Sequence, residues 1–233
     1  FYSVPHVRNY IKRQLQLELL GEVPVLSIRT EPLQNPVNRL AKRLFDLTFS
    51  SLFLLTIFPF MYLIVGLIIK ITSPGPIFFK QERNGENGKI FKCYKFRSMK
   101  VNALSDSLQA TKNDPRKTKF GNFLRKSNLD ELPQFINVFK GEMSIVGPRP
   151  HMLKHTEEYS QLINKYMMRH LVKPGITGWA QVTGYRGETK ELSQMEGRVR
   201  RDLWYIENWT FLLDIRIMIK TVTNMFRGEK NAY

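Results

Sequence analysis

A single uncharged run stands out in the pattern of apolar and polar positions along this chain. No charged residue occurs from Leu47 to Ile69, a stretch of 23 positions. A helix of that length would measure roughly 34 Å, enough to cross a bilayer. Pro59 lies near the middle of the run, where it removes a hydrogen bond and kinks the helix. Each arm would then measure roughly 18 Å, which is too short to cross alone.

Basic residues flank the run on both sides. Arg39, Lys42 and Arg43 precede it, and a longer series of lysines and arginines follows it from Lys70 to Arg97. Positive charge marks the cytoplasmic side of a membrane segment, and here it marks both ends. We therefore predict a re-entrant helix over about residues 44–70 that enters and leaves the same leaflet. The alternative, which hydropathy alone favours, is a plain transmembrane helix.

The segment before this run differs in character. The apolar pattern predicts a short buried strand over Val23–Ile28, and the proline-containing residues 30–36 indicate a linker after it. The chain opens on Phe1 rather than Met, and we expect it to be the C-terminal piece of a longer protein. Residues 1–37 would be the tail of a preceding domain plus a linker, and residues 38–233 a membrane-associated domain.

Shorter patterns after the run predict one hairpin and several helices. Residues 77–79 and 90–96 flank a glycine-containing connection, which predicts a β-hairpin. Residues 106–119 are polar and indicate an exposed loop or helix. Apolar positions at helical spacing predict helices over residues 132–139, 152–170 and 203–226. The last of these mixes aromatic, apolar and basic residues, which suits an interfacial helix as well as an ordinary core helix. The expected fold is α+β and mainly helical, with a re-entrant membrane helix, interfacial amphipathic helices and a small β-hairpin.

Charge narrows the choice of partners. The formal net charge is +16 and the isoelectric point is about 10.0. Such an excess points to a polyanionic partner, which could be nucleic acid, anionic lipid or a phosphorylated substrate. Cys93 is the only cysteine, so an intramolecular disulfide is excluded.

Two adjacent carboxylates are the main candidate for chemistry. Asp130 and Glu131 lie between the basic residues Arg125, Lys126 and Arg149. Cations around carboxylates suggest a site that handles phosphate, because they hold both the acids and an anionic substrate.

The position of this pair has two interpretations. Pro133 suits a first helical turn, so the pair should lie at a helix N-terminus. Asn128 with Glu131 could then form a capping box, or Asp130 could be the N-cap. In the functional interpretation, the helix terminus and the nearby cations favour an ionised carboxylate that can act as a nucleophile.

Other basic residues have candidate roles. Two prolines surround Arg149 in the sequence Gly-Pro-Arg-Pro and would hold its guanidinium ready for phosphate. Arg125 could orient Asp130 by a salt bridge or bind phosphate. Lys95 and Arg97 alternate on a predicted strand and should face one side together, toward phosphate or lipid headgroups, unless they are surface charges.

A glycine-punctuated loop and a histidine pair have open interpretations. Residues 174–184 could place backbone amides and an aromatic side chain near a nucleotide, or form a buried structural loop. His151 and His155 are four apart, with Glu158 three further on, and could form a metal-binding helix face. Nothing in the sequence supplies the rest of a zinc site, so we expect them to be solvated.

Five motifs in order carry a family resemblance. They are KRLFD (42–46), SPGPIFFKQERNG (73–85), YKFRSM (94–99), the stretch 124–150 around the carboxylate pair, and RHLVKPGITGWAQVTG (169–184). Together they resemble the bacterial sugar transferases, the monotopic polyprenyl-phosphate phosphoglycosyl transferases. The resemblance covers roughly residues 38–228 and is closest to the C-terminal catalytic part of the large members.

The resemblance implies a two-step reaction at the bacterial inner membrane, on its cytoplasmic face. Asp130 would attack the sugar-proximal phosphate of a UDP-sugar, most simply a UDP-hexose, and UMP would leave. Undecaprenyl phosphate would then take the phosphosugar from Asp130, in the first membrane step of exopolysaccharide, capsule or O-antigen synthesis. Glu131, with Asp130, would bind Mg²⁺. Anionic lipid would be a partner and nucleic acid would not. The resemblance leaves open whether the protein forms a homo-oligomer.

The resemblance also suggests substrate contacts for two later residues. Arg186 corresponds to a family arginine, although Tyr185 intervenes here and weakens the match. Asp202 matches an acidic family position with a nucleotide or metal role, or is a helix-surface residue. Three other functions compete: a nucleic-acid-binding protein, a Leloir-type glycosyltransferase that releases UDP, and a basic membrane-anchored binding protein without activity.

Overall fold

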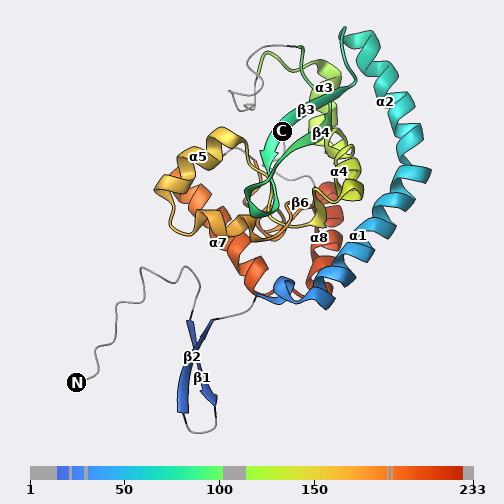
Figure 1. Ribbon diagram of the computed structural model, residues 1–233. Helices are drawn as coiled ribbons and strands as arrows, with labels where there is room; N and C mark the ends of the chain where they lie inside the picture. The colour runs from blue at the N-terminus through green and yellow to red at the C-terminus, as the bar shows by residue number, and fades with distance from the viewer. Residues whose placement is uncertain are drawn as a thin grey trace.

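The computed structural model describes residues 15–20, 23–28, 31–101, 114–187, 189 and 191–227. The helices are α1 (Pro36–Thr56), α2 (Phe58–Thr72), α3 (Lys119–Lys126), α4 (Gln134–Lys140), α5 (Leu153–Leu162), α6 (Trp179–Val182), α7 (Leu192–Glu207) and α8 (Phe211–Arg227). The strands are β1 (Leu15–Leu20), β2 (Val23–Ile28), β3 (Phe78–Asn84), β4 (Ile90–Phe96), β5 (Ser144–Val146) and β6 (Gly175–Thr177). Figure 1 shows how these elements are arranged. The bent helix pair α1–α2 runs along one side, the remaining helices gather beside it around the β3–β4 hairpin, and the β1–β2 hairpin projects away from them. The mainly helical α+β fold with a small hairpin is therefore confirmed.

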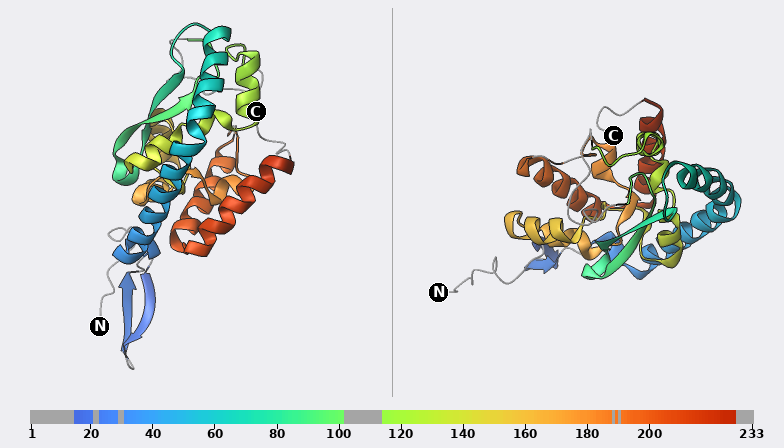
Figure 2. Two further views of the ribbon diagram at one scale, coloured as in Figure 1. Left: turned by 90° about the vertical axis from the view of Figure 1, so that its right-hand side faces the viewer. Right: turned by 90° about the horizontal axis from the view of Figure 1, so that it is seen from above.

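The uncharged run forms the bend of α1 and α2. The two helices meet at Ile57 and are inclined by 56° to each other. Pro59 lies in the first turn of α2, where its missing amide hydrogen costs no helical bond. The predicted kink is confirmed, but the helical stretch begins at Pro36 and ends at Thr72, so the expected bounds of 44–70 were too narrow. Figure 2 shows the bend from above.

Neither α1 nor α2 alone has the length and the apolar composition of a membrane span. In the described part of the chain no single helix is both long and apolar enough to cross a bilayer, whereas α1 and α2 meet that test together. Many large apolar side chains on the pair are nevertheless exposed, among them Leu55 at 79% and Ile71 at 75%. Such a contiguous apolar surface marks an interaction face.

Polar contacts attach α1 to the rest of the fold. Arg43 donates to the carbonyls of Val138 and Phe139 at the end of α4, at 2.7 and 2.8 Å. Asp46 accepts from the backbone amide of Ile145 in β5 at 3.0 Å. The base of α1 therefore holds the two elements that flank the carboxylate pair and Arg149.

Two predicted helices were wrong in their continuity. The stretch 152–170 is broken after α5, because Lys165 has a left-handed backbone (φ 63°) and a 3-10 helix, Tyr166–Leu171, follows. The stretch 203–226 is broken between α7 and α8. There the Thr210 hydroxyl accepts from the amide of Leu213 at 3.1 Å, and this side-chain cap starts a new helix.

The other predictions fared better. The hairpin is confirmed as β3 and β4, which pair antiparallel with Phe78 opposite Phe96, and the helix predicted over 132–139 is α4. The strand predicted over 23–28 is β2, although its partner β1 was not expected. Residues 106–113 of the polar segment 106–119, which was predicted as loop or helix, lie outside the described residues. The boundary between residues 37 and 38 stays a prediction.

Candidate active site

A cavity of about 330 Å³ lies between the β3–β4 hairpin, the turn before α4 and the start of α5. Among the described residues, nine cationic side chains and two carboxylates line it. The carboxylates are Asp130 and Glu131, and the cations are Arg83, Lys95, Arg97, Lys100, Arg116, Arg125, Arg149, Arg186 and Arg198. A concave site with this excess of positive charge suits phosphate groups.

The carboxylate pair lies on a short 3-10 turn, Leu129–Glu131, just before α4. Asn128 starts this turn in a left-handed conformation (φ 59°), and its side chain makes no cap hydrogen bond. Its Oδ1 instead accepts from the guanidinium of Arg186. Both capping interpretations were therefore wrong: Asn128 and Glu131 form no capping box, and Pro133 rather than Asp130 occupies the N-cap of α4.

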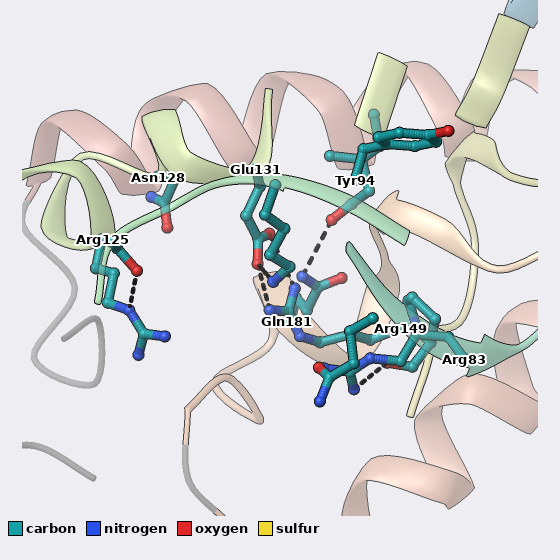
Figure 3. Close-up of polar contacts among 12 residues, drawn as sticks. Arg83, Tyr94, Arg125, Asn128, Glu131, Arg149 and Gln181 are labelled. Carbon is teal, nitrogen blue, oxygen red and sulfur yellow. Dashed lines mark hydrogen bonds and ion pairs between the residues drawn. The ribbon is translucent and has the colours of Figure 1, made fainter. Parts of the chain in front are cut away.

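Glu131 is held by two cations. Lys95 Nζ lies 2.6 Å from Glu131 Oε1. Arg149 donates with both terminal nitrogens, to Oε2 at 3.1 Å and to Oε1 at 2.5 Å, and Figure 3 shows the two side chains pointing toward each other. Burial raises the pKa of Glu131, but Arg149 and Lys95 outweigh it and hold that pKa well below its ordinary value. Glu131 is therefore a fixed anion.

Asp130 is in the opposite situation. Its side chain is 6% exposed, and within the described part of the chain no side chain or backbone group forms a hydrogen bond or ion pair with it. Burial, followed by the adjacent Glu131 carboxylate, raises the pKa of Asp130 from 3.8 to about 6. The expectation that nearby cations dominate its ionisation was wrong, because they are committed elsewhere. At neutral pH the residue is still mainly ionised.

The backbone that presents Arg149 depends on a close approach. Residues Ser144–Val146 pair in parallel with Gly175–Thr177, and the Gly-Pro-Arg-Pro segment follows directly. A Cβ at Gly175 would lie 2.0 Å from the amide nitrogen of Gly147, so only glycine fits there. Part of the predicted glycine-rich loop is thus structural, and it positions Arg149.

Four of the other predicted site residues lie in the cavity wall. Lys95, Arg125 and Arg186 line the cavity, as does Arg97. Arg125 donates to Ser98 Oγ at 2.9 Å, and the described residues show no ion pair between it and Asp130. The buried guanidinium of Arg97 donates to Pro74 O at 2.8 Å and also to Ser73 O, so it fixes the turn after α2.

Asp202 and the histidines are placed differently from the expectation. Asp202 is buried, lies outside the cavity lining, and accepts from Arg169 Nη2 at 2.7 Å. The described residues contain no cluster of three or more metal-ligating side chains. His151 is buried rather than solvated, so that expectation was wrong for it; His151 and His155 both border the cavity.

Sequence reasoning missed several residues of the cavity wall. Arg83 donates to Pro150 O at 3.3 Å and to Gln81 Oε1, and it lies beside Arg149 in Figure 3. Arg198 donates to the carbonyls of Tyr185 and Gly187, at 3.1 and 2.9 Å. The alternation of Gln81 and Arg83 along β3 is the signal that could have found this side of the site, but the predicted strand ended at residue 79.

Comparison with known proteins places the fold in a family. Residues 37–228 match the family described as bacterial sugar transferase. The chain belongs to the bacterial sugar transferase family. The match contains the carboxylate pair, the residues that hold Glu131 and nearly all of the helix pair α1–α2. Three of the five motifs that suggested the resemblance, 73–85, 94–99 and 124–150, contribute residues to the cavity lining.

Curated relatives give more detail about what this chain is similar to. It is 52% identical, over 99% of its length, to a protein of Escherichia coli K12 named UDP-glucose:undecaprenyl-phosphate glucose-1-phosphate transferase. A protein of Xanthomonas campestris with the same name is 48% identical over 99% of the chain. The chain covers 49% and 48% of these two proteins, so it spans about half the length of the relatives.

A shorter relative delimits the shared region. An exopolysaccharide production protein from Rhizobium leguminosarum is 45% identical over 81% of this chain, and the aligned region covers 96% of that protein. Almost the whole of that relative therefore aligns with this chain.

Proposed function

We propose that this chain carries the catalytic part of an enzyme that transfers glucose 1-phosphate from UDP-glucose to undecaprenyl phosphate and releases UMP. The observation that supports this most is the contrast between the two carboxylates: Glu131 is clamped by Arg149 and Lys95, whereas Asp130 is buried but uncommitted. The names of the relatives, which are 48–52% identical, supply the substrates. The product would start exopolysaccharide, capsule or O-antigen synthesis.

In the proposed reaction, Asp130 is the nucleophile. An Asp130 carboxylate oxygen forms a bond to the sugar-proximal phosphorus, and the bond from that phosphorus to UMP breaks with its electrons leaving on UMP. A phosphate oxygen of the lipid then attacks the same phosphorus, and the bond to Asp130 breaks. The carboxylate is regenerated. A pKa of about 6 suits this role, because the group is ionised at neutral pH yet more nucleophilic than an ordinary carboxylate.

The cations have distinct tasks in this scheme. Glu131 orients Arg149, whose five donors in a planar fork suit phosphate oxygens. Arg186 and Arg125 also line the cavity. Arg186 is oriented by its hydrogen bond to Asn128, and Arg125 by its hydrogen bond to Ser98. A preorganised cationic wall stabilises the charge on phosphate oxygens in the transition state without moving during the reaction.

Mg²⁺ is part of the proposal. Asp130, which has no hydrogen-bond partner among the described residues, would offer this ion a carboxylate, whereas Glu131 would have to give up a contact with Lys95 or Arg149 to join it. Phosphate oxygens and water would complete the shell. When bound, the ion would neutralise phosphate charge and polarise the phosphorus–oxygen bonds.

The order of product release tests the covalent step. Incubation with UDP-glucose and Mg²⁺ alone should release at most one UMP per active site, and the protein should gain the mass of one phosphohexose. Undecaprenyl phosphate should then remove the adduct. Release of UDP would indicate a Leloir-type transfer. Absence of UMP without lipid, together with intersecting double-reciprocal lines, would show direct attack in a ternary complex.

We also propose that α1 and α2 form a re-entrant pair in the cytoplasmic leaflet of the inner membrane. The 56° bend and the exposed apolar side chains support this placement. Cysteines introduced at Val37 and Ile71, which are 72% and 75% exposed, should both be labelled only from the cytoplasmic side. The native Cys93 is buried and serves as the unlabelled background. Labelling of either position from the periplasm would contradict a re-entrant pair.

A further inference from the structure

A buried network lies directly behind Arg149. Arg169 is 2% exposed and donates through Nη2 to the carbonyl of Arg149 at 2.8 Å and to Asp202 at 2.7 Å. Its Nη1 faces Nδ1 of His151, which also lies 2.6 Å from the hydroxyl of Tyr166. One guanidinium therefore fixes both the backbone of the catalytic arginine and the ring of the histidine two positions later.

These contacts assign the proton on the His151 ring. A guanidinium has donors and no acceptor, so the nitrogen that faces it, Nδ1, must accept. A neutral imidazole with an accepting Nδ1 carries its hydrogen on Nε2. Burial, followed by the charge of Arg169, lowers the pKa of His151 well below its ordinary value, so the ring stays neutral. His151 is thus a neutral side chain with one donor left, Nε2–H.

That donor has no partner inside the part of the chain that the structure describes. Nε2 is buried and forms no hydrogen bond there. A buried donor left unsatisfied lowers stability, and native proteins rarely keep one without a use. His151 borders the same cavity as Asp130 and Arg149. A small movement of the ring when the cavity is occupied would bring the buried Nε2–H to an acceptor on the bound molecule.

We infer that His151 donates from Nε2 to a hydroxyl oxygen of the sugar carried by the nucleotide. The inference rests on the proposed function and identifies a specificity-determining residue for it. The cavity wall is rich in cationic side chains, which suit phosphate oxygens, whereas the neutral Nε2–H of His151 is suited to an uncharged oxygen. The sugar is bonded to the phosphate that Asp130 attacks, so it must enter beside Arg149.

Binding measurements in an Asp130→Asn background test this without turnover. Titrations of purified full-length chain with UDP-glucose and with UDP give two dissociation constants for each variant. His151→Asn keeps an acceptor near Nδ1 for Arg169 and loses the Nε2 donor. It should weaken UDP-glucose roughly 3- to 10-fold, the worth of one neutral hydrogen bond, and leave UDP unchanged. His151→Gln keeps a donor near Nε2 and should recover most of the affinity for UDP-glucose.

Several outcomes would overturn the inference. They are an unchanged affinity for UDP-glucose in His151→Asn, or an equal loss for UDP and UDP-glucose, which would indicate a purely structural role. UDP-glucose analogues that each lack one sugar hydroxyl test the hydrogen bond from the ligand side. One analogue should bind roughly 3- to 10-fold more weakly than UDP-glucose to the protein that retains His151, and in His151→Asn this difference should vanish. If every analogue binds like UDP-glucose, the assignment fails. If Asp130→Asn binds no UDP-sugar at all, the proposed function itself fails.

Discussion

Replacing Asp130 by asparagine is expected to abolish sugar-phosphate transfer and, at neutral pH, to make the fold more stable. The amide cannot serve as the nucleophile, so the rate should fall by at least about 10³-fold. The amide also carries no charge, and it removes a buried carboxylate whose pKa stands at about 6 instead of 3.8. Each unit of pKa shift is worth about 1.4 kcal/mol, so the gain in unfolding free energy should approach about 3 kcal/mol.

The sign of this gain gives it a characteristic pH dependence. The folded protein holds the Asp130 proton more tightly than the unfolded chain, so the wild type loses stability as pH rises from about 4 to about 6. The advantage of Asp130→Asn should therefore be full above pH 6 and fade below it. Unfolding midpoints from pH 4.5 to 8, measured in one detergent, check this.

The neighbouring carboxylate supplies a control of opposite sign. Arg149 and Lys95 hold the pKa of Glu131 well below its ordinary value, which outweighs the effect of burial, so its ionised form stabilises the fold. Glu131→Gln should lower the unfolding midpoint at neutral pH and slow transfer without removing the nucleophile. Near-normal turnover in Asp130→Asn would show that the covalent scheme is wrong. A lower unfolding midpoint in Asp130→Asn would show that the ionised Asp130 carboxylate does not destabilise the fold.

The elements with strong local signals could be predicted from the sequence. Pro59 inside an uncharged run gave the kink, and the glycine-containing connection gave the β3–β4 hairpin. The breaks at Lys165 and between Glu207 and Phe211 could not be predicted in this way, because the apolar pattern continues through them. At the first break Ile163 is extended and Lys165 is left-handed, and at the second a threonine hydroxyl caps the start of α8.

The membership of the site could be predicted in part, but the roles of its members could not. Proximity in sequence brought Asp130, Glu131 and Arg149 together as candidates. The division of labour between the two carboxylates depends on Lys95, which comes from a strand 36 residues away. Asp202 shows the converse: its acidic character was visible, but only the fold shows that Arg169 buries and neutralises it.

A second large effect is expected at a buried ion pair that joins α1 to α8. Asp214 accepts three hydrogen bonds, from Lys42 at 2.5 Å, Tyr205 at 2.8 Å and Trp209 at 3.0 Å. The side chains of Lys42 and Asp214 are only 11% and 3% exposed. Lys42 belongs to the first family motif, so this contact assigns part of that motif to the attachment of the bent helix pair.

Asp214→Ala should lower the unfolding free energy by about 3–5 kcal/mol, because it leaves Lys42 as an uncompensated buried charge. The loss should appear as a lower unfolding midpoint and as earlier proteolytic cleavage within α1 or α8. The matched control is the exposed pair Arg39–Glu86, whose side chains are 56% and 23% exposed. Glu86→Ala should cost less than about 1 kcal/mol.

A double variant distinguishes the ion pair from simple loss of packing. Changing Lys42 to Met together with Asp214 to Leu removes both charges and retains apolar volume, so the pair should be far more stable than Asp214→Ala alone. A loss in the double variant as large as in the single one would mean that the bonds from Tyr205 and Trp209 to Asp214, rather than the charge of Lys42, hold α8 against α1. Activity follows the same logic, because Arg43 and Asp46 on α1 contact α4 and β5. A variant that loosens α1 should therefore lose transfer activity in proportion to its loss of stability, whereas Asp130→Asn loses activity while gaining stability.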